Sequence, residues 1–188
     1  SYQCRFAASG ENLHAVWIEY NFTSGEGTRY ITSYSRSTNN GQLWSIPYQM
    51  HEAGTENSGY RPTVAVASVG ASNYVHVGWY EYFRESLGTY EVQMRSSSDG
   101  GVIFGQVKEI SDENDDGIYA SPYNPLEIRA NSEGEVHLTW ARTQYDGDPA
   151  IIIVRSTNSG SSFGEPVEVD SGAPSVARDW PGMDIEGD

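Results

Sequence analysis

Two short sequence patterns recur three times along this 188-residue chain, with a common period of about sixty residues. A five-residue segment ending in tryptophan occurs at 13–17, 75–79 and 136–140, and its tryptophans are 62 and then 61 positions apart. A serine-led element follows each segment, at 37–44, 97–104 and 156–163, with its first serines 60 and then 59 positions apart. Such periods predict similar units that pack against one another, because one unit alone cannot bury its apolar surface.

Each unit is predicted to contain four β-strands and no helix. In the middle unit, alternating or β-branched runs lie at about 62–69, 74–82, 89–96 and 103–110. Residues 70–73 and 131–134 have the composition of hairpin turns. The 20 glycines, 13 tyrosines and 5 tryptophans suit strands and tight turns. Four antiparallel strands in sixty residues are typical of a propeller blade.

The serine-led element is expected to form the turn between the third and fourth strands. Serine and Asp or Asn side chains can bond the turn's own backbone, glycine accepts the unusual dihedral, and the final aromatic is expected to pack back between the strands. Its positions are Ser37, Asn39, Gly41 and Trp44, then Ser97, Asp99, Gly101 and Phe104, then Ser156, Asn158, Gly160 and Phe163. The pattern S-x-D/N-x-G-x-x-W/F resembles the Asp-box (BNR repeat) of sialidase-superfamily propellers, and the resemblance covers the whole chain.

The resemblance implies an all-β propeller segment of three four-stranded Asp-box blades plus the first strand of a fourth. The expected boundaries are blade 1 at about 1–52, blade 2 at about 60–111, blade 3 at about 124–170 and the start of blade 4 at about 180–188. Propellers close with four to eight blades. We therefore expect the remaining blades to come from a longer chain, which we favour, or from a second copy.

Charge and cysteine content exclude some classes of function. The 26 acidic and 11 basic residues give a formal net charge of −15, which disfavours nucleic acids and anionic membrane surfaces. No apolar run approaches the length needed to cross a bilayer. Cys4 is the only cysteine, so no intrachain disulfide can form. The acidity and the low lysine content favour an extracellular or cell-surface location.

Chemistry is expected at the rim opposite the serine-led turns, where the repeat breaks down. The candidate ligand-binding residues of this rim are Tyr60, Arg61, Tyr119, Tyr123, Tyr145 and Trp180, which include stacking platforms for sugar rings. If the resemblance extends to a sialidase-like activity, the catalytic candidates are Arg61, Glu81, Tyr82, Arg142 and Arg178. Glu81 cannot activate Tyr82 if one strand runs through both, because adjacent residues point to opposite faces.

Metal binding is considered at two places. Residues 112–117 fit a D-x-N-x-D-G loop, in which Asp112, Asn114 and Asp116 offer oxygen ligands to Ca²⁺; a solvated acidic loop is the alternative. His14, His76 and His137 occupy equivalent positions on separate units, so we expect packed, hydrogen-bonded histidines instead of zinc ligands. No cofactor is required, and Ca²⁺ is the one candidate.

Function remains open between three classes. We expect a non-catalytic module of a secreted or surface protein that binds a glycan or a protein. The alternatives are a fragment of a sialidase-like glycoside hydrolase and an architectural surface-protein repeat, because a fold alone does not choose among them.

Overall fold

The computed structural model describes residues 2–23, 27–51, 57–82, 90–111, 119–120, 125–143 and 150–169. Within these ranges the secondary structure is entirely β, and there is no helix long and apolar enough to cross a bilayer. The predicted first strand of a fourth unit, at about 180–188, lies outside them.

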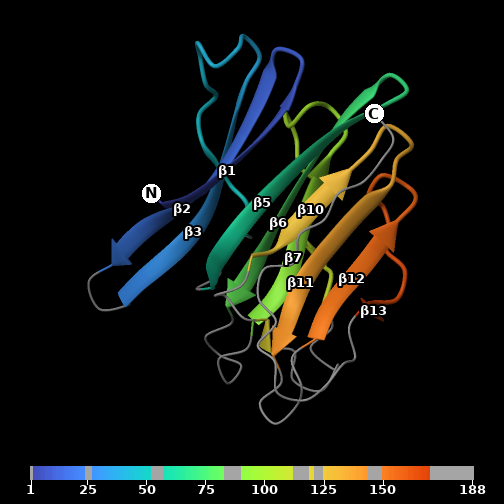
Figure 1. Ribbon diagram of the computed structural model, residues 1–188. Helices are drawn as coiled ribbons and strands as arrows, with labels where there is room; N and C mark the ends of the chain where they lie inside the picture. Colours follow the sequence, from blue (N-terminus) through green and yellow to red (C-terminus); the bar gives the residue numbers. More distant parts are fainter. Residues whose placement is uncertain are drawn as a thin grey trace.

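Twelve of the strands form three antiparallel groups of four, which we name units 1, 2 and 3 (Figure 1). Unit 1 contains β1 (Tyr2–Ser9), β2 (Asn12–Thr23), β3 (Gly27–Ser37) and β4 (Tyr48–Gln49). Unit 2 contains β5 (Ser58–Val69), β6 (Ser72–Tyr82), β7 (Tyr90–Ser97) and β8 (Lys108–Glu109). Unit 3 contains β10 (Glu127–Ala130), β11 (Val136–Thr143), β12 (Ala150–Ser156) and β13 (Val167–Glu168). In each unit the strands pair in chain order.

A short additional strand, β9 (Tyr119–Ala120), joins units 2 and 3. It pairs antiparallel with β11 and parallel with β7, so these two units form one nine-stranded sheet. Figure 1 shows unit 2 between unit 1, drawn in blue, and unit 3, drawn in yellow to orange. The predicted four-strand plan is therefore present in all three units.

The fourth strand is much shorter than the sequence predicted. Residues 103–110 were expected to be extended, but β8 contains two residues. Residues 103–107 precede the strand without regular secondary structure, and Phe104 and Val107 pack against the apolar cluster between units 1 and 2.

The core consists of the two interfaces between neighbouring units, which we name seam 1–2 and seam 2–3. Seam 1–2 contains Val16, Tyr34 and Met50 of unit 1 together with Val64, Val75, Val77 and Trp79 of unit 2. Seam 2–3 includes Tyr80, Val92 and Met94 of unit 2 with Ile128, Leu138 and Trp140 of unit 3. Trp79 and Trp140 are only 1% and 0% exposed, so each unit is stabilised mainly by its neighbours.

The turns after β3, β7 and β12, which we name the serine turns, have a common bonding pattern. In unit 2 the Ser97 hydroxyl donates to Asp99 Oδ1 at 2.6 Å and accepts the Gly101 N–H at 2.9 Å. Asp99 Oδ1 also accepts the Ile103 N–H at 3.0 Å. The corresponding serine and asparagine of units 1 and 3 make the same contacts. Two consecutive residues with positive φ complete each turn.

The serine turns of units 2 and 3 also dock onto the preceding unit. A side chain on Gly101 would collide with the Tyr34 ring of unit 1, and one on Gly160 would press on His76 of unit 2. The Phe104 ring packs 4.8 Å from the Tyr34 ring, across the seam. The aromatic was expected to pack back between the strands, and Phe104 in addition packs against the neighbouring unit across seam 1–2.

Candidate functional site

The two ends of each unit differ in what they carry. The serine turns lie at the same end as the β1–β2, β5–β6 and β10–β11 turns, and we name this the turn end. The last residues of β2, β6 and β11 and the first residues of β3, β7 and β12 lie at the opposite end, which we name the loop end (Figure 1). This arrangement agrees with the expected placement of the serine turns away from the irregular connections.

Five tyrosines at the loop end form a continuous row across units 1 and 2, which we name the tyrosine row. Neighbouring ring centroids are separated by 5.0 Å (Tyr20–Tyr30), 4.8 Å (Tyr30–Tyr60), 5.7 Å (Tyr60–Tyr90) and 5.0 Å (Tyr90–Tyr82). Tyr20 is 57% exposed and the other four are half-buried. Tilted and edge contacts of this length are favourable between aromatic rings. The row is thus an ordered aromatic surface with one end open to solvent.

Strand register and a bulge build the row. Tyr20 faces Tyr30 across β2 and β3, and Tyr82 faces Tyr90 across β6 and β7. Tyr60 bridges these two pairs from the start of β5, where the register with β6 shifts between Tyr60 and Thr63. Arg61 in this bulge has φ 50°, and its N–H donates to the Gln3 side chain at 3.1 Å. Bulges of this kind re-aim side chains, and they concentrate near functional sites.

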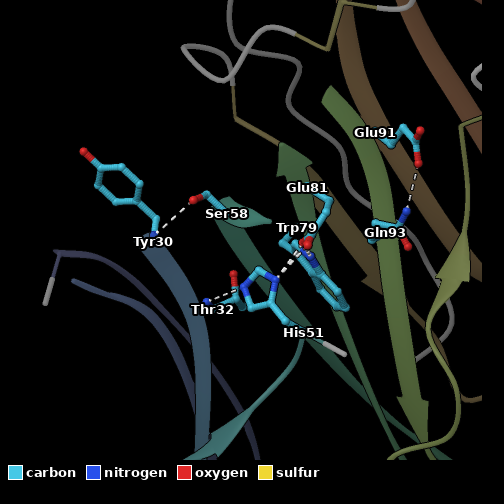
Figure 2. A network of polar contacts seen from close by, with 8 residues as sticks. All are labelled: Tyr30, Thr32, His51, Ser58, Trp79, Glu81, Glu91 and Gln93. Carbon is cyan, nitrogen blue, oxygen red and sulfur yellow. Dashed lines mark hydrogen bonds and ion pairs between the residues drawn. The ribbon is translucent and has the colours of Figure 1, made fainter. Parts of the chain in front are cut away.

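A buried polar network lies below the row in seam 1–2 (Figure 2). The Thr32 N–H donates to His51 Nε2 at 2.8 Å, so the proton of this ring is on Nδ1. His51 Nδ1 lies 3.0 Å and 2.8 Å from the two Glu81 carboxylate oxygens. The Trp79 indole N–H donates to the same carboxylate at 2.6 Å. His51 of unit 1 therefore holds Glu81 of unit 2 through a directed hydrogen bond.

The network joins the tyrosine row through backbone contacts. The Tyr30 N–H donates to Ser58 Oγ at 3.3 Å, while the Tyr30 ring points away from the network in Figure 2. Beyond Glu81, the Gln93 amide donates to Glu91 at 3.0 Å. Glu81 and Glu91 are 5% and 7% exposed and lie opposite each other in the β6–β7 pairing. The row therefore lies next to a buried polar network on one side, while Tyr60 and Tyr90 pack against the apolar cluster of seam 2–3.

The structure brings some of the predicted site residues together. Tyr60 and Tyr82 belong to the tyrosine row, and Arg61 directly follows Tyr60. Glu81 is committed to His51 and Trp79 below the row. Because β6 runs through both Glu81 and Tyr82, they point to opposite faces. Arg142 lies in unit 3, where its Nη2 donates to Glu168 at 2.8 Å.

The other predicted site residues have less or no structural description. Tyr119 lies in β9, and nothing is described of its side chain. The candidates outside the described residues are Tyr123, Tyr145, Trp180 and Arg178 of the rim and Asp112, Asn114 and Asp116 of the calcium loop. Within the described ranges, no three His, Cys, Asp or Glu side chains gather as a metal site would require.

Sequence reasoning did not single out Tyr30, Tyr90 or His51. The two tyrosines occupy equivalent positions in the third strands of units 1 and 2, each seven residues before the first serine of the following turn, and this shared position was a usable signal. His51 had no such signal, because the equivalent position of unit 2 is Ser111, whose hydroxyl accepts the Val92 N–H at 2.8 Å. Comparing equivalent positions of the repeated units therefore gave no indication of His51.

Two of the repeated histidines, His14 and His76, are buried and hydrogen-bonded as expected, whereas His137 is half-buried and its Nε2 has no hydrogen-bond partner among the described residues. His14 Nδ1 lies 2.7 Å from the Tyr34 hydroxyl, and His76 Nδ1 lies 2.9 Å from Ser96 Oγ. Burial lowers the pKa of both to about 4, helped by the positive charges of Arg36 and Lys108 respectively. Both side chains are therefore neutral near pH 7.

A small hollow lies at the turn end of seam 1–2. Its volume is about 120 Å³, and its lining includes His14, Arg36 and Asp99. That volume suits roughly four water molecules, well below the several hundred Å³ of typical ligand pockets. The tyrosine row is therefore the better candidate for binding a larger ligand.

Comparison with known proteins identifies the fold. The sequence matches no protein-family model, and no curated protein matches it significantly. Among solved structures, it resembles the Hadza microbial sialidase Hz136 (TM-score 0.54, 16% identity, 82% of this chain and 34% of that one). It also resembles a Trypanosoma rangeli sialidase mutant displaying trans-sialidase activity (0.53, 16%, 86% and 29%) and the T. rangeli sialidase in complex with sialic acid (0.52, 16%, 85% and 29%). The chain has a sialidase-like fold and spans about a third of the length of these proteins.

Proposed function

We propose that this chain is a glycan-binding module whose binding surface is the tyrosine row at the loop end. The observation that carries the proposal is the continuous contact of five tyrosines whose terminal ring, Tyr20, is 57% exposed. Tyrosine offers both an apolar ring face and a polar hydroxyl, which suits the alternating apolar and hydroxylated surface of a sugar. The contacts between neighbouring rings order them before binding, which lowers the entropic cost of binding.

Binding without turnover is favoured over hydrolysis by the state of Glu81. A general acid or base must reach the substrate, but Glu81 is 5% exposed and already holds two hydrogen bonds inside seam 1–2. The likeness to sialidases concerns the fold alone at 16% identity. A protein ligand on the same surface, or an architectural role, remains the contrasting outcome of the experiment below.

We infer further that the serine turns are Asp-boxes and that the three units are propeller blades. Their hydrogen bonding supports the first point, and the side-by-side packing of four-stranded units supports the second. On this view additional blades, from a longer chain or from a second copy, complete the ring. An extracellular or cell-surface setting and a Ca²⁺ ion at 112–117 belong to the same proposal.

A glycan array probed with the full chain tests the proposed function. We expect retention of a restricted set of glycans, no release of chromophore from aryl glycosides, and a measurable Kd for the best glycan by calorimetry. Tyr20→Ala should weaken that Kd by about 5- to 30-fold, because a lost stacking contact costs about 1–2 kcal/mol. Phe6→Ala, which removes a 66% exposed ring of β1 outside the tyrosine row, should leave the Kd unchanged.

Three results would contradict the proposal. Absence of any retained glycan would remove it, and capture of a protein ligand sensitive to Tyr20→Ala would replace it with a protein-binding role. Release of chromophore would assign the chain to the hydrolases.

A further inference from the structure

A tryptophan and a glutamate two residues later form a hydrogen-bonded pair in two of the three units. In unit 1 the Trp17 indole N–H donates to Glu19 at 2.8 Å, and in unit 2 the Trp79 indole N–H donates to Glu81 at 2.6 Å. In unit 3 the equivalent tryptophan is Trp140, but Arg142 stands where the glutamate is expected.

This replacement puts a donor in the place of an acceptor. The Oε atoms of glutamate and the Nε atom of arginine are the same number of bonds from Cα. Trp140 Nε1 and Arg142 Nε are both buried, and neither has a hydrogen-bond acceptor among the described residues. Trp140 is 0% exposed, so water outside the molecule cannot serve it. Unsatisfied buried donors are rare in folded proteins and demand a partner.

Seam 2–3 also lacks the side chain that fills this place in seam 1–2. There, His51 of unit 1 accepts the Thr32 N–H and reaches on to Glu81. The corresponding residue in unit 2 is Ser111, which accepts the Val92 N–H at 2.8 Å but carries no ring beyond its hydroxyl. The shorter serine side chain therefore does not supply seam 2–3 with the ring that contacts the glutamate in seam 1–2.

The charge and the donors of this place suit an anion. Arg142 is positively charged, and its one hydrogen-bond acceptor among the described residues is Glu168, which its Nη2 contacts at the half-exposed edge of unit 3. The Tyr80 hydroxyl, which also lacks a partner among the described residues, belongs to the same apolar cluster as Trp140. Burial raises the pKa of Tyr80 and the nearby positive charge of Arg61 opposes this. An anion accepts from all such donors, whereas a water molecule would need acceptors of its own.

We propose that seam 2–3 is a binding site for a small carboxylate, whose oxygens accept hydrogen bonds from Trp140 Nε1 and Arg142 Nε. The flat, two-oxygen carboxylate matches what Glu19 and Glu81 present to the tryptophans of units 1 and 2. The side chain of Arg142 is 18% exposed, so it connects the site with solvent at the edge of the seam. Tyr60 and Tyr90 of the tyrosine row pack against the same apolar cluster. The donors of this site belong to other residues, Trp140 and Arg142, so the inference does not depend on the proposed function.

The test titrates sodium acetate into the ¹⁵N-labelled full chain, with the ionic strength held constant by sodium chloride. We expect a saturable shift of one tryptophan indole N–H resonance, assigned to Trp140 by its loss in Trp140→Phe. At a tenfold excess of acetate over Kd, Tm should rise by about 3–6 °C relative to the same concentration of chloride.

Arg142→Glu is the decisive variant, because it restores the pair found in units 1 and 2. It should fold with a Tm at least equal to that of the acetate-free wild type and show no response to acetate. Trp140→Phe keeps the arginine. It should raise the Kd for acetate, obtained from the dependence of Tm on acetate concentration, by about tenfold. This variant tests the site if Arg142→Glu does not fold. Arg155→Gln, an exposed arginine on the neighbouring strand β12, should keep the full response.

Two results would overturn the inference. One is a wild-type Trp140 resonance that acetate leaves unchanged, which would indicate a buried water as the acceptor. The other is an equal response of Tm to acetate in the wild type and in Arg142→Glu.

Discussion

Gly59 pairs with Glu81 between β5 and β6, beside the ring of His51. A Cβ atom at Gly59 would lie 2.5 Å from His51 Cε1 and 2.6 Å from Nε2, and would also collide with Thr32 Oγ1. All these neighbours are buried, so none can move without disturbing seam 1–2. The absence of a side chain is therefore what allows His51 to reach Glu81.

Gly59→Ala is expected to lower the free energy of unfolding by about 1–3 kcal/mol, the usual cost of overpacking a core. Urea denaturation of both proteins measures this. Gly105→Ala is the matched control, because its Cβ would meet only the Ser96 carbonyl oxygen at an ordinary 3.6 Å. Equal free energies of unfolding for Gly59→Ala and wild type would show that the residues of seam 1–2 can move to accommodate the added methyl group.

His76 predicts a pH dependence with a definite sign. Burial, with a contribution from Lys108, lowers its pKa in the folded chain to about 4, against about 6.5 when unfolded. Between about pH 4 and 6.5 the unfolded chain therefore binds a proton at this residue that the folded chain does not bind. The contribution of neutral His76 to the free energy of unfolding is complete above about pH 6.5 and is lost as the pH falls through about 4. Protonation of His76 is therefore expected to lower the free energy of unfolding by about 2–3 kcal/mol between pH 7 and pH 4.5.

His76→Asn should remove this part of the loss while keeping a polar partner for Ser96. The free energies of unfolding of wild type and variant, measured between pH 7 and 4.5, should converge as the pH falls. His14 has a similarly lowered pKa and remains in the variant, so the decline is reduced but not abolished. Parallel curves would show that His76 is not buried in its neutral form.

At the scale of the element, the serine turns offer an internal comparison. Asp99 in unit 2 occupies the position of Asn39 in unit 1 and Asn158 in unit 3, and all three accept turn N–H groups through one side-chain oxygen. Although burial tends to raise it, the pKa of Asp99 is lowered by hydrogen bonds from Ser97 and from backbone N–H groups. The hydrogen bonds of the turn therefore require a side-chain oxygen at this position, whereas the negative charge of an aspartate contributes little.

Asp99→Asn is therefore expected to change the free energy of unfolding by less than about 0.5 kcal/mol, whereas Asp99→Ala should cost about 1–2 kcal/mol, as for a lost helix cap. Thermal and urea denaturation of the two variants measure the difference. If Asn proves as harmful as Ala, the carboxylate charge and not the turn bonding stabilises this element.

The strands and the serine turns could be predicted because their signals are local. Alternating apolar residues, glycines and serines repeat within short windows, and the turn hydrogen bonds join residues only two to four positions apart. The tyrosine row depends instead on register, since Tyr20 and Tyr30 meet only when β2 and β3 pair correctly. The N–H donors of Trp140 and Arg142 indicated a binding site only once the structure showed that they are buried without an acceptor among the described residues.

At the scale of the whole molecule, the units interlock through their turns. Arg36 of unit 1 donates to the Gly100 carbonyl oxygen of unit 2 at 3.3 Å. Lys108 of unit 2 donates to the carbonyl oxygens of Gly160 and Ser161 of unit 3, at 2.5 Å and 2.6 Å. The only lysine of the chain thus ties a serine turn to the preceding unit.

A formal net charge of −15 predicts how salt affects this interlocked molecule. The 26 acidic residues repel one another in the compact fold, and mobile ions screen that repulsion over a Debye length that shortens from about 30 Å at 0.01 M to about 3 Å at 1 M. Screening also weakens ion pairs such as Arg129–Glu127, but exposed pairs contribute about 1 kcal/mol or less each. Repulsion should therefore be the larger effect.

We expect Tm at pH 7 to rise by several degrees, on the order of 1–2 kcal/mol of stability, between 0.02 M and 0.5 M sodium chloride. Near pH 4.5, the isoelectric point of the sequence, the rise should vanish because the net charge does. Arg142→Glu should show the same rise of Tm with sodium chloride at pH 7, because screening acts on the charge of the whole molecule. This variant therefore distinguishes charge screening from anion binding in seam 2–3. A Tm that falls with salt at pH 7 would mean that attractive pairs outweigh the repulsion between acidic residues.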